Sequence, residues 1–385
     1  MQTTAPPRGI GATLRRDPAA PWRHLDWPLL GAALAIAGLG ALMVFSATRT
    51  AMADAGLDPA TYLKRQLAFI ALGAVVMAVV VAVDYHTYRD FAPIGYLGAL
   101  VLLVLVLSPL GVEVRNAQSW FRIGSFQLQP AEFAKLALIV VLATSCSSRG
   151  GSVTRQRLVV SLGIAAVPIA LVLLQPDLGS ALVLVAIVVG VLVVAGTRPR
   201  HLAALTAIGV LAVVAMFQLD LVDDYQRKRL TEFARSEGTT STGPGFQSEQ
   251  AETAIGAGGL FGTGLFEGTQ TKLGFVPEQQ TDFIFTVVGE ELGFAGAATL
   301  VLLYGVVVWR VWRTAQLSRD LFGTLVCAGV LAMLLFQVFE NMGMSMGLMP
   351  ITGLPLPLMS YGGSSMLTTC AALGLVLNVH MRRFS

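Results

Sequence analysis

"EQQTDFIFTVVGEELGFAG", residues 278–296, sets an aspartate directly against the start of a long apolar run. Asp282 precedes the run, which continues to about residue 308 and is interrupted early by Glu290 and Glu291. A hydrophobic stretch of about 20 residues can cross the hydrocarbon core of a bilayer as a helix. The stretch therefore predicts a membrane-spanning helix with a carboxylate at its lip, which is either a helix cap or a group held where water is scarce.

The rest of the chain has the same character, with 385 residues of which 55% are hydrophobic and only 13% charged. Soluble domains carry roughly 25% charged residues, and the short alternating segments of a membrane barrel are absent. Since lipid admits only helices and closed barrels, we predict an all-α polytopic integral membrane protein with about ten transmembrane helices. The expected spans are 28–46, 67–83, 92–108, 128–146, 158–174, 178–196, 201–217, 283–308, 322–346 and 363–380.

The first of these runs is followed by "AMAD", residues 51–54, which is similar to a signal-peptide cleavage site. A polar lead of 27 residues and an apolar run of about 19 are both long for a signal peptide. We therefore expect the run to be retained as a membrane span.

The basic residues of the connections fall on alternate sides of the predicted spans. One side holds Arg8, Arg15, Arg16, Arg23, Arg89, Arg149, Arg155, Arg157, Arg198, Arg200, Arg310, Arg313, Arg319, Arg382 and Arg383. Cytoplasmic loops carry the excess of Lys and Arg, so this side is predicted to be cytoplasmic, together with both termini. We expect tails at 1–27 and 382–385, one ten-helix domain at 28–381, and large external segments at 47–66, 109–127 and 218–282.

The residue types on the predicted external face limit its chemistry. All four histidines lie on or near the cytoplasmic side, and the three cysteines lie in apolar segments. Histidine triads, thiol nucleophiles and His/Cys zinc sites are therefore not expected there. Carboxylates, Arg and Lys, hydroxyls and a hard cation held by oxygens remain.

Several charged groups lie at the external ends of the spans. Glu132 and Lys135 are three residues apart, so they share a helix face, and either mutual pairing or function explains their place beside an apolar run. Asp177 follows a proline between two spans and either caps the second span or serves the site. Arg227 and Arg229 suit anionic headgroups or a diphosphate equally well.

Two further segments have unusual backbone requirements. The glycines between 256 and 268 fit no phosphate-loop pattern and indicate close packing at the membrane surface. The stretch 347–366 contains three prolines and three internal glycines, so it cannot form a regular helix. We predict an irregular segment buried against protein, which is tolerated at membrane depth where it lines a cavity. Such a cavity suits an amphiphile with an anionic head and a long hydrocarbon tail.

Five motifs together resemble the SEDS family of bacterial envelope proteins. They are "QPAEFAKLAL", "QPDLGSALV", "DYQRKRL", "GTQTKLGFVPEQQTDFIFTVVGEELG" and "PLPLMSYGGSSM". They occur in the family's order over nearly the whole chain, and the third and fourth are more similar to its elongation branch, RodA, than to its division branch, FtsW. The resemblance implies a peptidoglycan glycosyltransferase that polymerises lipid II at the outer face of the cytoplasmic membrane. It also implies a class B penicillin-binding protein and the elongation-complex membrane proteins as partners, and no nucleic acid.

The family's motifs transfer specific roles to this chain. Its essential aspartate falls on Asp282, its Glu and Lys on Glu132 and Lys135, and the P-D-L-G motif points to Asp177. Two departures stand out. Gln280 occupies a position where close relatives often have His. Ser119 precedes Trp120 where relatives commonly have Arg, for which Arg115 and Arg122 are the nearest substitutes.

The mechanism that follows is an inverting displacement. A sugar 4-hydroxyl attacks an anomeric carbon while a lipid diphosphate leaves, which calls for a general base and for positive charge. Asp282 is the predicted base. Glu132 is a second candidate, or it orients Lys135. The predicted substrate-binding residues are Glu132, Lys135, Asp177, Arg65, Arg227, Arg229, Gln247, Ser248, Ser360 and Tyr361. A divalent cation, Mg²⁺ or Mn²⁺, is the one cofactor considered; its ligands are not assigned and no organic cofactor is expected.

Two alternatives remain from other functional classes. A flippase for lipid-linked precursors also needs a polar cavity among helices, but it should carry its charges near the bilayer midplane and show repeated halves. A non-catalytic scaffold would explain the long external segment but gives no reason for a cavity carboxylate. The charges at the external edge favour the enzyme.

Overall fold

The computed structural model describes residues 24–114, 117–124, 126–147, 154–218 and 244–383. Each of the ten predicted spans coincides with a helix, and the prediction of a polytopic helical membrane protein is confirmed. The ten helices are α2 (Trp27–Asp54), α3 (Thr61–Ala82), α5 (Ala92–Val106), α6 (Pro130–Cys146), α7 (Arg155–Leu173), α8 (Leu178–Val194), α9 (Pro199–Gln218), α13 (Ile284–Leu317), α14 (Leu321–Ser345) and α15 (Gly363–Met381).

Length and composition make most of these helices candidate membrane spans. Within the described residues, six are both long and apolar enough to cross a bilayer, namely α2, α3, α7, α13, α14 and α15. Two shorter apolar helices, α5 and α8, accompany them. Apolar side chains on the outward faces of α3 and α5, including Leu72, Val75, Ile94 and Val101, are exposed, as expected for helices whose surroundings are lipid.

One connection between the predicted helices contains a small sheet that the sequence did not predict. Between α5 and α6 the chain forms three short antiparallel strands, β1 (Val112–Val114), β2 (Ala117–Ile123) and β3 (Phe126–Leu128), in the order β1-β2-β3. Gly124 has φ +63°, and this left-handed conformation lets the chain reverse between β2 and β3. β3 leads directly into α6, which begins at Pro130, two residues after the predicted start of this span.

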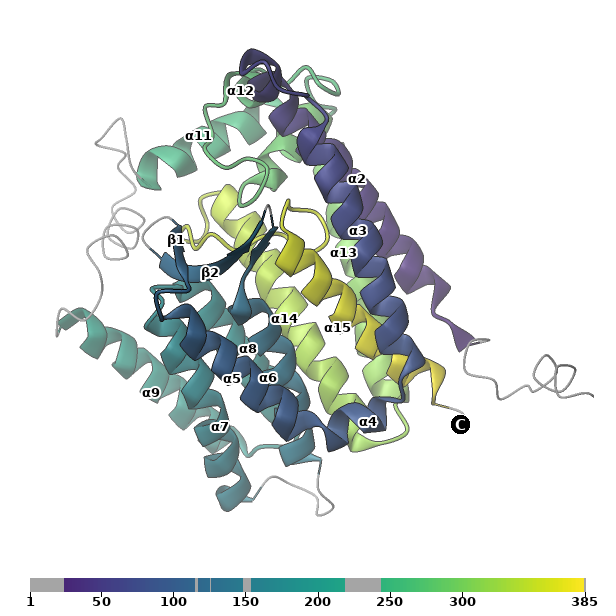
Figure 1. Ribbon diagram of the computed structural model, residues 1–385, viewed down its shortest axis with the longest axis vertical. Coiled ribbons are helices and arrows are strands. Elements are labelled where there is room, and N and C mark those ends of the chain that lie inside the picture. Colours follow the sequence, from purple (N-terminus) through teal and green to yellow (C-terminus); the bar gives the residue numbers. More distant parts are fainter. Residues whose placement is uncertain (1–23, 115–116, 125, 148–153, 219–243, 384–385) are drawn as a thin grey trace, which may run out of the picture.

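The other connections also differ from the predicted boundaries. The first connection is only residues 55–60, since α2 continues to Asp54 and α3 begins at Thr61; Arg65 therefore lies on a helix. A short helix, α4 (Tyr85–Asp90), joins α3 to α5. The segment before Asp282 contains α11 (Pro244–Ala257) and α12 (Thr269–Leu273), at the upper end of the bundle in Figure 1.

The helices surround α14 and α15 in the middle of the molecule (Figure 1). α14 packs against α6, α8 and α13, and α15 packs along α3. Glycines allow the closest approaches: a Cβ on Gly73 of α3 would lie 2.7 Å from Cys370 Sγ, and one on Gly190 of α8 would lie 2.4 Å from Ala332 Cβ. The helix that carries Glu132 (α6) and the helices that begin just after Asp177 and Asp282 (α8 and α13) all pack against α14.

The span that follows Asp282 is not continuous. Gly293 has φ 62° and ψ −162°, so α13 consists of a short buried helix before the kink and a longer one after it. The segment that contains the glycines between 256 and 268, which we call the glycine-rich strip, runs beside the kink. Thr263 N–H donates to Glu290 O at 2.9 Å and Phe294 N–H to Gly259 O at 2.9 Å. These bonds give partners to backbone groups that the kink removes from the hydrogen-bond ladder of the helix. The strip and the kink are in direct backbone contact, so the predicted close packing of the glycine-rich segment is confirmed.

Candidate active site

Asp282 lies in the turn immediately before α13 and its residue surface is 9% exposed. Its N–H donates to Glu278 O at 3.1 Å, and its carbonyl accepts a bond from Asn341 Nδ2 at 2.7 Å. The carboxylate faces the backbone of Gly353, where an added Cβ would lie 3.4 Å from Asp282 Oδ2. The N-cap of α13 is Phe283, so Asp282 does not occupy the capping position. These two bonds fix the backbone of Asp282 at the lip of a buried helix.

The irregular segment between α14 and α15 lies against Asp282. Gly40 of α2 packs against it so closely that a Cβ there would lie 2.5 Å from Met359 O, and Tyr304 Oη donates to Pro357 O at 2.6 Å. Leu354, Leu356 and Met359 are buried. The prediction of an irregular segment buried against protein is confirmed. We call residues 350–361 the proline loop.

Two predicted substrate residues, Ser360 and Tyr361, end the proline loop. Ser360 is buried, and its Oγ accepts a bond from Leu356 N–H at 2.8 Å, so this hydroxyl closes a turn of the loop. Tyr361 N–H donates to Gln280 O at 2.8 Å. This bond ties the loop to the residues that lead into Asp282. The structure thus brings both residues close in space to the predicted base.

Arg65 and Tyr361 also come together. The Tyr361 ring contacts Tyr62 and Phe69 with centroids 4.9 and 5.8 Å away. Burial raises the pKa of the Tyr361 hydroxyl, and a hydrogen bond with Arg65 opposes this shift. Arg65 itself is exposed on the first turns of α3. An exposed cation oriented by a tyrosine at the edge of the site is available to an anionic ligand.

Glu132 and Lys135 form an ion pair inside the bundle. Lys135 Nζ lies 2.7 Å from Glu132 Oε1, and their side chains are 0% and 3% exposed. The prediction that they share one face of α6 is confirmed, and so is their mutual pairing. A buried pair offsets its desolvation cost only when the geometry is good. Charges this deep in an apolar bundle also mark functional sites by default.

Asp177 acts as a helix cap and as a link between helices. Its Oδ1 accepts a bond from Ser180 N–H at 2.9 Å, which caps α8. Its Oδ2 accepts a bond from Gln129 Nε2 at 2.8 Å, and Gln129 N–H donates to Ser364 Oγ at 3.0 Å. Asp177 therefore joins the starts of α8 and α6, and the main chain of Gln129 joins the start of α6 to α15.

Close packing connects this junction to Asp282. A Cβ on Gly179, two residues after Asp177, would lie 3.0 Å from both Thr352 O and Leu354 Cγ of the proline loop. The adjacent residue, Gly353, is the one that faces Asp282. The proline loop thus connects the start of α8, which Asp177 caps, to Asp282.

Glu290 and Glu291 support the fold around this region. Glu290 accepts bonds from Gln270 N–H at 2.7 Å, Thr271 N–H at 2.9 Å and Thr271 Oγ1 at 2.7 Å. Glu291 accepts a bond from Ser46 Oγ of α2. Both carboxylates therefore support the packing and the polar contacts of the helix that carries them. They attach the turn around α12 and the end of α2 to the short helix that follows Asp282.

The remaining predicted residues lie at the margin or outside the described chain. Gln247 and Ser248 are half-buried on α11, which packs against α13. Arg122 is exposed on β2, and Ser119 is buried. Arg227, Arg229 and Arg115 lie outside the described residues.

Sequence reasoning missed three residues of this region, which are Asn341, Gly353 and Gln129. Asn341 is fully buried in α14. Its signal was available, since a polar residue near the end of an apolar span is a functional hypothesis by default. Gly353 has φ +74°, which the sequence alone does not reveal. Gln129 belongs to this region because its side chain bonds Asp177, which is 48 positions away in the sequence.

The side chains do not build a closed metal site. Among the residues that the structure describes, no three His, Cys, Asp or Glu side chains gather closely enough to hold a metal ion. Proteins commonly bind Mg²⁺ through one or two carboxylates together with substrate phosphates.

Comparison with known proteins places the chain in a family. Residues 27–384 match the family model for FtsW, RodA and SpoVE, described as a cell cycle protein. Stage V sporulation protein E of Bacillus subtilis is 40% identical over 345 residues, 89% of this chain and 93% of that protein. A probable peptidoglycan glycosyltransferase FtsW of Geobacter metallireducens is 39% identical over 365 residues, 93% of this chain and 95% of that protein.

Solved structures agree with the sequence matches. A chain from a study of a peptidoglycan synthase complex that coordinates polymerization and crosslinking superposes with a TM-score of 0.79 at 34% identity. It covers 93% of this chain and 98% of that chain. The crystal structure of Thermus thermophilus RodA gives a TM-score of 0.70 at 34% identity, covering 94% and 99%. The chain therefore belongs to the SEDS family, the family of FtsW, RodA and SpoVE.

Proposed function

We propose that this SEDS protein is a peptidoglycan glycosyltransferase that polymerises lipid II, with Asp282 as the general base. The observation that carries the proposal is the setting of Asp282. The residue is 9% exposed at the end of the bundle, and its backbone is bonded on both sides. The curated relative from Geobacter metallireducens is named as a peptidoglycan glycosyltransferase, which supports the same chemistry here.

The residues divide the reaction into two tasks. Asp282 accepts the proton of the attacking sugar hydroxyl, and cationic side chains stabilise the diphosphate as it leaves. Displacement in one step inverts the anomeric centre, so one carboxylate suffices and no covalent intermediate forms. Arg65 is exposed and has a hydrogen bond with Tyr361. This position suits binding of the anionic diphosphate headgroup of lipid II. Arg227 and Arg229 are proposed for the same diphosphate on their sequence alone.

The buried ion pair has a different task in this proposal. Lys135 is fully buried and already bonded to Glu132, so it acts on the substrate through the field of the pair or after a rearrangement of the pair. Asp177 joins the start of α8 to the start of α6. Gln247, Ser248 and Ser360 complete the proposed binding region. Asp282 would help to hold a divalent cation, which would supply positive charge toward the departing diphosphate.

We also propose a cellular role for the protein. The curated relatives described above are named FtsW and SpoVE, and the solved structure at 34% identity is RodA. We propose the elongation role because of the sequence motifs noted above. A class B penicillin-binding protein and the elongation-complex membrane proteins would be the partners. We place the Asp282 end outside the cytoplasmic membrane and both termini inside, following the distribution of arginines.

A gel assay of glycan products tests the proposal. Purified full-length protein is incubated with lipid II, alone and with its penicillin-binding partner, with Mg²⁺, Mn²⁺ or a chelator. Wild type should produce polymer, and Asp282→Ala and Asp282→Asn should produce none while they melt at the temperature of wild type. Polymer from folded Asp282→Ala contradicts the assignment of the base. Transbilayer movement of lipid II without any polymer would instead support the flippase.

A further inference from the structure

Asn341 is a buried side chain that joins the segment ending at Asp282 to the proline loop. It lies near the end of α14 and is 0% exposed. Its single Nδ2 donates to Asp282 O and to Leu354 O, both at 2.7 Å. Both acceptors are main-chain carbonyls, so only the NH2 side of the amide can face them. The orientation of Asn341 is therefore fixed by the two segments that it joins.

The carbonyl bonded by Asn341 belongs to Asp282 itself. In the first turn of α13, Thr286 N–H bonds Phe283 O at 3.0 Å, so the backbone of the helix begins after Asp282. The Leu354 carbonyl lies next to Pro355, which has no N–H, in a segment poor in donors. Asn341 supplies donors to both groups from a third element.

The geometry points to a consequence for the carboxylate. Leu354 follows Gly353, the residue whose backbone faces Asp282 Oδ2. A second bond, from Tyr361 N–H to Gln280 O at 2.8 Å, joins the same two segments farther along. Because Asn341 holds Asp282 and Leu354 on one nitrogen, it sets the position of the carboxylate relative to the loop. We propose that Asn341 is a positioning residue for Asp282, an inference that rests on the proposed function.

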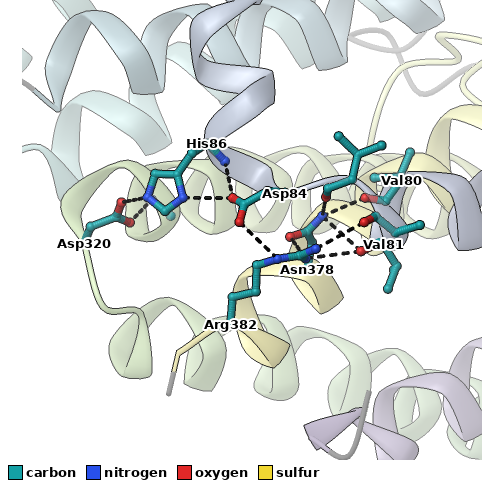
Figure 2. A network of polar contacts seen from close by, with 10 residues as sticks. Val80, Val81, Asp84, His86, Asp320, Asn378 and Arg382 are labelled. Carbon is teal, nitrogen blue, oxygen red and sulfur yellow. Dashed lines mark hydrogen bonds and ion pairs between the residues drawn. The ribbon is translucent and has the colours of Figure 1, made fainter. Parts of the chain in front are cut away.

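The chain contains a matched control at the opposite end of the bundle. Asn378 of α15 is also buried, and its Nδ2 donates to main-chain carbonyls of Val80, at 2.6 Å, and of Val83 (Figure 2). Arg382 donates to Asn378 Oδ1. Asn378 therefore does the same structural work, an asparagine amide bonded to backbone carbonyls, at the end of α15 far from Asp282.

The test compares isosteric substitutions at the two asparagines. Asn341→Leu and Asn378→Leu each remove the amide while keeping the same branched arrangement of heavy atoms, and Asn341→Asp removes the NH2 donors with less change in polarity. For each full-length variant, the rate of lipid II polymerisation is measured over a range of lipid II concentrations. The rates are divided by the concentration of protein that binds lipid II, and kcat and KM are obtained from them. Thermal unfolding is recorded alongside.

We expect both Asn341 variants to lower kcat by about 10- to 100-fold, because displacing a catalytic group by about 1 Å costs this much. KM should change little, and Asn378→Leu should keep kcat even though it lowers the melting temperature. The inference is overturned if the Asn341 variants keep kcat, or if Asn378→Leu loses as much. It also fails if neither Asn341 variant folds while Asn378→Leu does, since the role would then be structural.

Asp282→Ala in the same assay separates this inference from the proposed function. If Asp282→Ala polymerises lipid II, the proposed base is wrong and the inference falls with it. If Asp282→Ala is inactive while the Asn341 variants are as active as wild type, only the inference is wrong.

Discussion

Lys135 Nζ and Glu132 Oε1 lie 2.7 Å apart, one helical turn from the start of α6, and both side chains are almost completely excluded from solvent. Breaking a buried pair leaves one charge without a partner, at a cost of about 3–5 kcal/mol. Lys135→Met and Glu132→Gln should each lower stability by this order, and the double variant should recover much of the loss. Thermal unfolding in detergent measures all three.

An exposed pair provides the control for this experiment. Lys64 and Asp58 lie 2.6 Å apart with side chains 71% and 50% exposed. Exposed pairs contribute little, so Asp58→Asn should leave the melting temperature unchanged. Equal losses at the two pairs would show that burial does not set the importance of the Glu132–Lys135 pair.

The kink in α13 predicts that alanine destabilises the protein at one glycine of this helix but not at another. An added Cβ on Gly293 would lie 2.3 Å from Gly262 N, at φ 62°. Strained backbone of this kind costs about 1–3 kcal/mol, so Gly293→Ala should lower the melting temperature and detach the glycine-rich strip. On the same helix, Gly305 has no atom within 4 Å of an added Cβ. Gly305→Ala should leave stability unchanged, and proteolysis of the strip should increase only in Gly293→Ala.

Substitutions at Asp177 separate its capping role from a direct role in catalysis. Loss of an N-cap costs about 0.5–2 kcal/mol, so Asp177→Ala should lower the melting temperature. Asp177→Asn keeps an oxygen for Ser180 N–H and should retain most polymerisation, because the structure gives its carboxylate two structural partners. Asp320, which caps α14 through Gly323 N–H at 2.8 Å, is the control cap. Strong loss of polymerisation in folded Asp177→Asn alone would assign its charge to the reaction.

Tyr361→Phe tests the orientation of Arg65. The substitution keeps the ring contacts with Tyr62 and Phe69 but removes the hydroxyl that contacts Arg65. A less ordered Arg65 should bind the anionic headgroup more weakly, so KM for lipid II should rise several-fold with a smaller change in kcat. Tyr96→Phe removes a hydroxyl bonded to Ile164 O in another part of the bundle and should leave KM unchanged. An unaltered KM in Tyr361→Phe would remove Arg65 from the proposed binding site.

The amino-acid sequence determined the class of fold and the composition of the site. Apolar runs of membrane length force helices, because lipid offers backbone groups no other partner, and each of the ten predicted runs is a helix. The pairing of Glu132 with Lys135 follows from a spacing of three residues on one helix. The irregular proline loop follows from its prolines, which lack the N–H that a helix requires.

The tertiary structure decided what no local pattern contains. The three-stranded sheet, the break at Gly293 and the lengths of α2 and α3 depend on which segments meet. The bonds from Asn341 to Asp282 and Leu354 span 59 and 13 positions of sequence. The sequence by itself named the aspartate at the lip of an apolar helix. Only the packing of α14, the proline loop and the turn before α13 fixes where its carboxylate lies, because buried carbonyls from distant segments must share the donors that the fold brings to them.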